Sequence, residues 1–285
     1  MNDSVYQFVD RVKREIDHGH PEIACFPEVA TQLIRELDSE QVAVHDIAKV
    51  VSSEPALALR VIGMANSAAY RSGGRAMTDV RMAITRVGLR ALRAVILAFA
   101  VMKIRESPPL RLVQHRIGDV WQQSTLTAAL CHLIALELRV EGIRHDHEAA
   151  MLAGLMQGVG KIFVFAEAAF RGELEDDPSA LDDIVRAWHA PAAAKLLAQW
   201  GLGKPVIDAV VGHESADQAI REKSNLTDLL HAAALFAEMR ESPQELARHV
   251  AASRACQRLE LWRLNPEHLL AQLANESDSL ESVLR

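Results

Sequence analysis

Apolar residues recur at intervals of three and four positions along most of this chain, a spacing that places them on one face of an α-helix. Val29, Leu33 and Leu37 mark one such face, and Val80 and Ile84 begin another. Glycine accounts for only 14 of the 285 residues, whereas alanine and leucine, both strong helix formers, are abundant. No segment shows the period of two that is typical of a β-strand. We therefore predict an all-α fold.

Two adjacent prolines, Pro108 and Pro109, form the clearest internal boundary, because proline cannot continue a helix. A chain of 285 residues can form one large domain or two small ones. Beyond the prolines, the apolar spacing predicts long helices over 110–139 and 147–170, the second capped by Asp146. Further helices are predicted near 191–200, 205–213 and 225–240, followed by a helical extension from Pro243.

Three features of the sequence favour a cytoplasmic protein without a membrane anchor. The longest apolar run, Ala94 to Met102, is far shorter than the ~20 residues of a membrane-spanning helix, so we expect a buried helix there. The first residues lack the basic segment and apolar stretch of a secretory leader. Cys25, Cys131 and Cys256 are isolated and odd in number, which is typical of reduced, mostly buried thiols.

Charge is distributed unevenly along the chain, which has a formal net charge of -7. Residues 60–116 contain eleven basic and two acidic side chains, a local charge of +9. Arg86, Arg90 and Arg93 follow helical spacing, although Gly88 is expected to break the helix between the first two. This surface could bind an anionic partner, such as an acidic protein face, a nucleotide or a nucleic acid. The alternative is a basic face that is merely solvated.

Two segments of the sequence carry a family resemblance. In the first, Glu54-Pro55-Ala56-Leu57 is followed by Asn66-Ser67-Ala68-Ala69-Tyr70. The second is Gly154-Leu155-Met156-Gln157-Gly158-Val159-Gly160-Lys161. Together they resemble the HDOD domain of bacteria, a degenerate relative of the HD phosphohydrolase superfamily. Within the first segment, Asn66 ends an apolar helix, and we expect its side chain to bond the following loop rather than to serve in catalysis.

The resemblance implies an HD-like helical bundle preceded by an N-terminal helical subdomain. It covers roughly residues 20–215, with an N-terminal helical half over 20–106 and a degenerate HD-like half over 110–215. The remaining segments are then an N-terminal helix over 1–19 and a C-terminal helical extension over 216–285. We use this division as the expected domain organisation.

The same resemblance indicates that the metal site of the HD superfamily has lost its ligands. The His-Asp pair that holds the catalytic metal in that superfamily corresponds here to Gln157 and Gly158. Gln123 stands at the position of the first His, and Ala234 at that of the closing Asp. A carboxamide is a weak, neutral metal ligand, and glycine and alanine offer none. We therefore expect no bound metal, no other cofactor and no catalytic residue.

Two histidines, His189 and His213, match positions that the superfamily retains, and Glu214 replaces the second member of a His-His pair. We interpret both histidines as remnants that cap a helix or satisfy a buried polar group. The alternative is a weak leftover site that a transition metal fills adventitiously.

The resemblance implies a bacterial, non-enzymatic signal-transduction module or scaffold that acts through protein–protein contacts. Because the sequence carries no receiver, GGDEF or EAL segment, we expect it to act on partners in trans. Two alternatives stay open: a metal-dependent phosphohydrolase, and a regulator that binds a nucleotide or a cyclic dinucleotide. Nucleic-acid binding is disfavoured by the acidic net charge and by the lack of a DNA-binding motif.

Overall fold

The computed structural model describes residues 3–18, 23–39, 43–67, 70, 76–170, 172 and 178–273. The elements within these ranges are helices, with no β-strand among them, which confirms the predicted all-α class. The chain forms two compact units that divide between Ser107 and Pro108, where the two prolines stand. Unit 1 comprises Met1–Ala24 and Pro108–Ser277, and unit 2 contains Cys25–Ser107.

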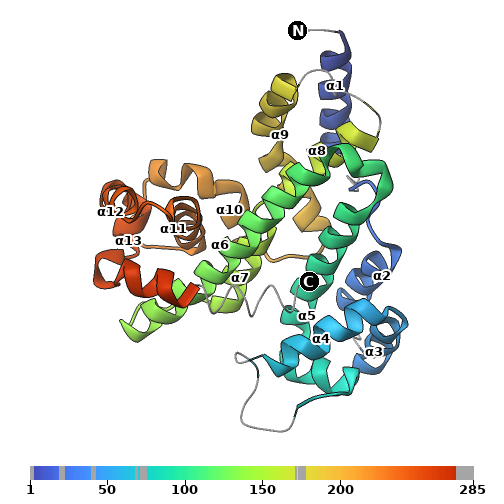
Figure 1. Ribbon diagram of the computed structural model, residues 1–285, viewed down its shortest axis with the longest axis horizontal. Helices are drawn as coiled ribbons and strands as arrows, with labels where there is room; N and C mark the ends of the chain where they lie inside the picture. The colour runs from blue at the N-terminus through green and yellow to red at the C-terminus, as the bar shows by residue number, and fades with distance from the viewer. Residues whose placement is uncertain are drawn as a thin grey trace. The chain divides into compact units, whose positions relative to one another are not determined.

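Unit 2 is built around one long helix, α5. Helices α2, α3 and α4 each pack against α5, as the blue and teal ribbons of Figure 1 show. Every residue from Ala94 to Met102 is buried, which confirms the buried helix predicted there. Gly88 has φ 82° and ψ 163°, so it interrupts the helical geometry as predicted. The helices span Glu28–Leu37 (α2), Val44–Ser53 (α3), Pro55–Asn66 (α4) and Val80–Glu106 (α5).

Asn66 connects the end of α4 to the segment that precedes α5. Its Nδ2 donates a hydrogen bond to the carbonyl oxygen of Met77 at 2.9 Å, and the Met77 amide donates to its Oδ1 at 2.7 Å. Both atoms of the carboxamide are therefore satisfied by one distant backbone position. The expected structural role of Asn66 agrees with this pair of bonds.

Replacing Asn66 with leucine is expected to destabilise unit 2 by about 1–3 kcal/mol, because both backbone groups of Met77 lose their partner while partly buried. Chemical denaturation followed by circular dichroism would measure this change. Asn66→Asp keeps the acceptor for the Met77 amide and is expected to lose less stability than Asn66→Leu. Equal melting temperatures for the wild type and Asn66→Leu would contradict this structural role.

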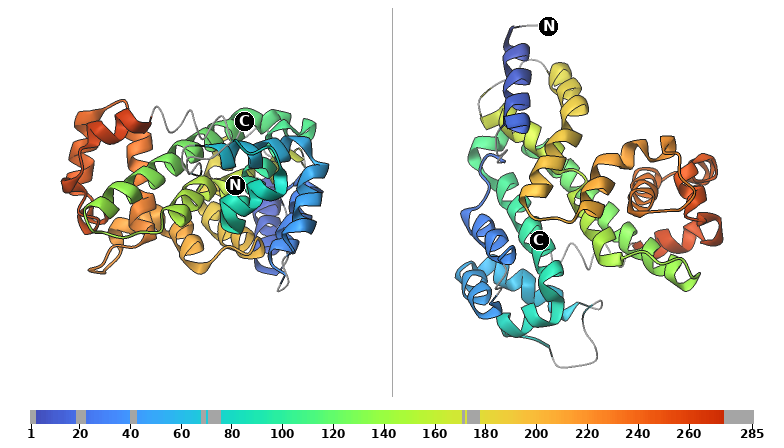
Figure 2. Two further views of the ribbon diagram at one scale, coloured as in Figure 1. Left: turned by 90° about the horizontal axis from the view of Figure 1, so that it is seen from below. Right: turned by 180° about the vertical axis from the view of Figure 1, so that it is seen from behind.

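Unit 1 contains the remaining helices, and its long helix α6 packs against α7 and α11. Helices α11, α12 and α13 pack together, and α1 packs against α9 elsewhere in the unit (Figures 1 and 2). The α-helices are α1 (Asp3–His18), α6 (Gln114–Val140), α7 (His147–Met156), α8 (Val159–Phe170), α9 (Pro178–Gln199), α10 (Lys204–Gly212), α11 (Leu226–Met239), α12 (Pro243–Ala252) and α13 (Arg254–Arg258). Short 3-10 helices are η1 (Pro108–Val113), η2 (His213–Gln218) and η3 (Leu261–Arg263), and residues 266–273 are also helical.

The helix predicted over 147–170 is interrupted at Gln157 and Gly158, which separate α7 from α8. Asp146 caps its start as predicted, since its carboxylate accepts the amides of Glu148 and Ala149. Among the described residues, His147–Phe170 is the one stretch whose length and apolar composition would allow it to cross a membrane. Of its most apolar window, 83% is buried within the protein, as in a core helix of any large domain.

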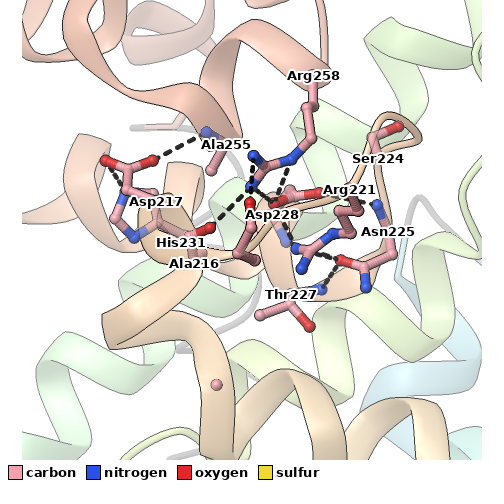
Figure 3. Close-up of polar contacts among 12 residues, drawn as sticks. Ala216, Asp217, Arg221, Ser224, Asn225, Thr227, Asp228, His231, Ala255 and Arg258 are labelled. Carbon is pink, nitrogen blue, oxygen red and sulfur yellow. Dashed lines mark hydrogen bonds and ion pairs between the residues drawn. The ribbon is translucent and has the colours of Figure 1, made fainter.

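A buried carboxylate, Asp228, holds the C-terminal helices of unit 1 together (Figure 3). Its side chain is 0% exposed and lies between two guanidinium groups, with Arg221 Nη2 at 2.6 Å and Arg258 Nη2 at 2.5 Å. Arg258 also donates to the carbonyl of Ala216 at 2.8 Å, which ties α13 to η2. The second carboxylate oxygen accepts the amide of Asn225, completing a capping box at the start of α11.

Candidate functional site

A cleft of about 700 Å³ in unit 1 brings together most of the positions that the sequence assigned to the degenerate metal site, although His189 is not among its lining residues. Its walls come from α6, the junction of α7 and α8, the start of η2, and α11. Residues that are far apart in the sequence therefore meet in one place. The assigned positions that line the cleft are Gln123, Gln157, Gly158, His213, Glu214 and Ala234.

Helical spacing explains why these side chains share the cleft. Gln123 lies three residues after Val120 on α6, and Ala234 lies three residues after His231 on α11. Positions three or four apart occupy the same face of a helix. Gln157 is fixed by a hydrogen bond from its Nε2 to Thr127 Oγ1 at 3.0 Å.

Glu214 is the centre of a charged network at the edge of the cleft. Its two carboxylate oxygens contact different partners, Lys161 Nζ at 3.0 Å and His189 Nε2 at 3.3 Å. These contacts hold the pKa of Glu214 well below its usual range, chiefly through the hydrogen bond from His189 and further through Lys161. The carboxylate is therefore ionised at neutral pH, and Lys161 already balances its charge.

The histidines near the cleft are held by backbone carbonyls. Nδ1 of His189 lies 2.9 Å from the carbonyl oxygen of Val185, and Nδ1 of His213 lies 2.8 Å from that of Val210. Burial lowers the pKa of His213, so its ring is neutral. His231 contacts the His213 carbonyl through Nδ1 at 2.8 Å.

The bare backbone at Gly158 is packed rather than open. A Cβ atom at this position would lie 2.3 Å from Cγ1 of Val120 and 2.9 Å from Oγ of Ser124. Both neighbours belong to α6, and valine has few rotamers with which to move away. Hence α6 now occupies the space that a carboxylate at position 158 would need.

The residues present do not fit the divalent metal that the HD resemblance implies. A divalent site needs several convergent His or carboxylate ligands, and no group of three or more His, Cys, Asp or Glu side chains is so placed in the described ranges. Glu214 is engaged by Lys161 and His189, and the ligand position at Gly158 is blocked by Val120. No chemical step through a metal follows from this donor set.

Sequence reasoning missed the roles of two residues that line the cleft, Lys161 and Val120. Lys161 belongs to the quoted motif, yet its role as the counter-ion of Glu214 depends on a contact across 53 positions. The role of Val120 has no signature in the sequence.

The proposed partner surface, formed by Arg86, Arg90 and Arg93, lies in unit 2, and two of these arginines make contacts within that unit. Arg93 forms an ion pair with Asp38 at 2.6 Å and is only 13% exposed. Arg86 donates to the carbonyl of Ala65 at 3.3 Å. Arg90 is exposed, whereas Arg60, in the same basic segment, is buried. Arg71 and Arg75 lie outside the described residues.

None of the three cysteines shows the features of a nucleophile. Cys131 and Cys256 are buried and Cys25 is partly exposed, and all three are free thiols. Burial raises the pKa of Cys256 to about 11 and that of Cys131 further, so both thiols are protonated at neutral pH.

Two solved structures share this fold along nearly the whole chain. A Shewanella amazonensis protein, described as a candidate metal-dependent phosphohydrolase, is 22% identical, with full coverage of both chains and a TM-score of 0.74. A Marinobacter aquaeolei protein, described as a candidate signal transduction protein, is 19% identical, covers 99% of this chain and 66% of its own, and has a TM-score of 0.54. At these identities, both likenesses establish the fold alone.

Sequence comparison identifies the family. An uncharacterized protein of Treponema pallidum (strain Nichols) is 24% identical over 211 residues, which are 70% of this chain. The aligned segment spans only 39% of that relative's length. The family model of the HDOD domain matches residues 23–216, well over half of the chain, and includes every assigned cleft position except Ala234. This protein therefore belongs to the HDOD domain family.

Proposed function

We propose that this protein is a non-enzymatic module of a bacterial signalling pathway, which acts in the cytoplasm through protein–protein contacts. The observation that carries the proposal is the state of the former metal site. Its positions converge on one cleft, yet Val120 fills the space beside Gly158, and Lys161 neutralises Glu214. A site arranged in this way supports binding more readily than metal-assisted hydrolysis.

Two further observations support a signalling role. The HDOD domain model matches residues 23–216, and the resemblance to this family implies signal transduction. The Marinobacter aquaeolei neighbour is described as a candidate signal transduction protein. The exposed Arg90 in unit 2 is the proposed centre of the protein-binding surface. A contact of this kind would depend on charge, so it would weaken as salt rises.

The alternative is a metal-dependent phosphohydrolase, as the description of the Shewanella amazonensis neighbour would suggest. In its favour, His189 and Glu214 lie 3.3 Å apart beside the cleft. That pair alone supplies one imidazole and one carboxylate, which are too few to hold a catalytic divalent ion. A second alternative is a nucleotide-binding regulator, which the volume of the cleft would allow.

Protein purified without chelators is expected to contain no stoichiometric iron, zinc or manganese, and to show no phosphodiesterase activity. The reason is that Gly158 and Ala234 stand at the two positions where the HD superfamily has an aspartate ligand, and neither residue has a side-chain atom that can bind a metal. Elemental analysis and hydrolysis of a chromogenic phosphodiester in the presence of added manganese would measure both properties.

The double variant His189→Ala/His213→Ala is the control for this experiment. Equal background hydrolysis by the wild type and the double variant is the expected result. About one transition-metal ion per chain, together with hydrolysis that the double variant abolishes, would establish the phosphohydrolase alternative instead.

A further inference from the structure

The cleft in unit 1 is lined by two carboxylates that form no ion pair with any cation in the described ranges. Lys161 is paired with Glu214 at 3.0 Å, and Arg240 donates to the Ala237 carbonyl and to Glu241. Asp119 and Glu238 also line the cleft and are exposed, and neither forms an ion pair with a described residue. The two carboxylates therefore leave the cleft with an excess of negative charge.

Two other side chains that line the cleft present hydrogen-bond acceptors. Nδ1 of His213 is directed to the Val210 carbonyl, so Nε2 of the neutral ring is left as an acceptor. The Nε2 group of Gln157 donates to Thr127, which leaves its carbonyl oxygen to accept. Both side chains line the cleft. The walls are therefore suited to a ligand that donates hydrogen bonds.

Ser124 gives an independent indication that the cleft is built for a ligand. Its side chain is 1% exposed and lines the cleft, and its Oγ has no hydrogen-bond partner among the described residues. A buried polar group without a partner costs about 1–3 kcal/mol. A ligand that bonds to this hydroxyl would recover that energy.

We infer that the cleft binds an organic cation rich in hydrogen-bond donors, with a primary ammonium or guanidinium group. Asp119 and Glu238 would pair with its charge, and Ser124 with one of its donors. Val120, Ala234 and Leu235 line the same space and would contact its carbon chain. The volume of about 700 Å³ is within the range of small-molecule sites, about 300–1,000 Å³. The inference rests on the proposed function in one respect, that no metal fills the cleft.

Two sources can supply this chemistry, a free amine or an arginine or lysine side chain of a partner protein. Agmatine, which carries an ammonium and a guanidinium on a short alkyl chain, is the probe for the first. An arginine-containing hexapeptide is the probe for the second. N-butylurea, neutral and of similar shape, tests whether charge is required.

Titration calorimetry on the full chain is expected to show saturable binding of one agmatine per chain, at least about tenfold tighter than that of N-butylurea. Asp119→Asn/Glu238→Gln should weaken agmatine binding by at least about tenfold, because both counter-charges are lost. The control Glu222→Gln/Glu267→Gln makes the same change in net charge at exposed positions outside the cleft and should bind like the wild type. Ser124→Ala should weaken binding several-fold.

Binding of the hexapeptide alone, lost in the cleft double variant, would identify a partner's side chain as the ligand and would support the inference. Failure of both cations to bind, equal weakening in the control variant, or displacement of agmatine by AMP would overturn it. Each titration is paired with metal analysis of the same sample. Absence of binding to metal-free protein overturns only this inference, whereas a bound catalytic metal overturns the proposed function.

Discussion

Replacing Asp228 with alanine is expected to lower the free energy of unfolding of unit 1 by about 3–5 kcal/mol. The carboxylate is 0% exposed, and its removal leaves the guanidinium of Arg258, itself only 9% exposed, without a counter-charge. Arg221 and the amide of Asn225 lose the same partner. Because these groups belong to α11, α13 and the segment that joins η2 to α11, the C-terminal helices should loosen first.

Urea denaturation of the purified protein would measure the loss, and hydrogen exchange would locate it. Asp208→Ala is the matched control, since Asp208 pairs with Lys204 on the surface of the same unit and should contribute less than about 1 kcal/mol. The double variant Asp228→Ala/Arg258→Met should lose less stability than the sum of the losses in Asp228→Ala and Arg258→Met. The reason is that the double variant leaves no buried Arg258 guanidinium without a counter-charge. Additive losses would mean that Asp228 and Arg258 do not depend on each other.

Gly160→Ala is expected to destabilise unit 1 by about 3 kcal/mol or more, through a collision between α8 and α9. The added Cβ would lie 1.8 Å from the carbonyl oxygen of His189 and 2.7 Å from its carbonyl carbon. Backbone atoms cannot rotate away as a side chain can, so the two helices must separate. The better helix propensity of alanine offsets only about 0.5–1 kcal/mol of this cost.

Thermal denaturation should show a melting temperature lower by roughly 6–12 °C for a unit of this size. Gly203→Ala is the control, because a Cβ there would have its nearest contact at 3.7 Å from Pro205, and its cost should be below about 1 kcal/mol. A displaced α9 would also disturb the pair of His189 and Glu214, which nuclear magnetic resonance of the His189 ring would detect. A melting temperature equal to that of the control variant would show that the helices adjust freely.

Local patterns were sufficient to predict the fold class and several of its details. Apolar spacing predicted most of the helices, although the helix expected near 191–200 begins at Pro178. Gly88 and Asp146 mark an interruption and a helix start where the sequence placed them. Asn66 was recognised because a short carboxamide at the end of an apolar helix must find partners nearby. The interruption at Gln157 and Gly158 was missed, since the apolar pattern of 147–170 continues through it.

The candidate site could be predicted only as far as the motif named its positions. The family resemblance identified Gln123, Gln157 and Gly158, and all three line the cleft. It did not indicate that Lys161 pairs with Glu214, because that contact joins segments whose packing no local pattern encodes. The contacts that Arg86 and Arg93 make within unit 2 were likewise not encoded by a local pattern. Arg93 pairs with Asp38 across 55 positions, and Arg86 donates to the carbonyl of Ala65 across 21.

The packing of Val120 against Gly158 restricts which substitutions position 158 can accept. The Cβ atom of any side chain introduced at position 158 would lie 2.3 Å from the Cγ1 atom of Val120, so a substitution to aspartate alone would place the side chain in space that is already filled. A smaller residue would have to appear at position 120 beforehand, although that change by itself brings no catalytic benefit. An aspartate at position 158 therefore requires two ordered substitutions, the first of them at position 120.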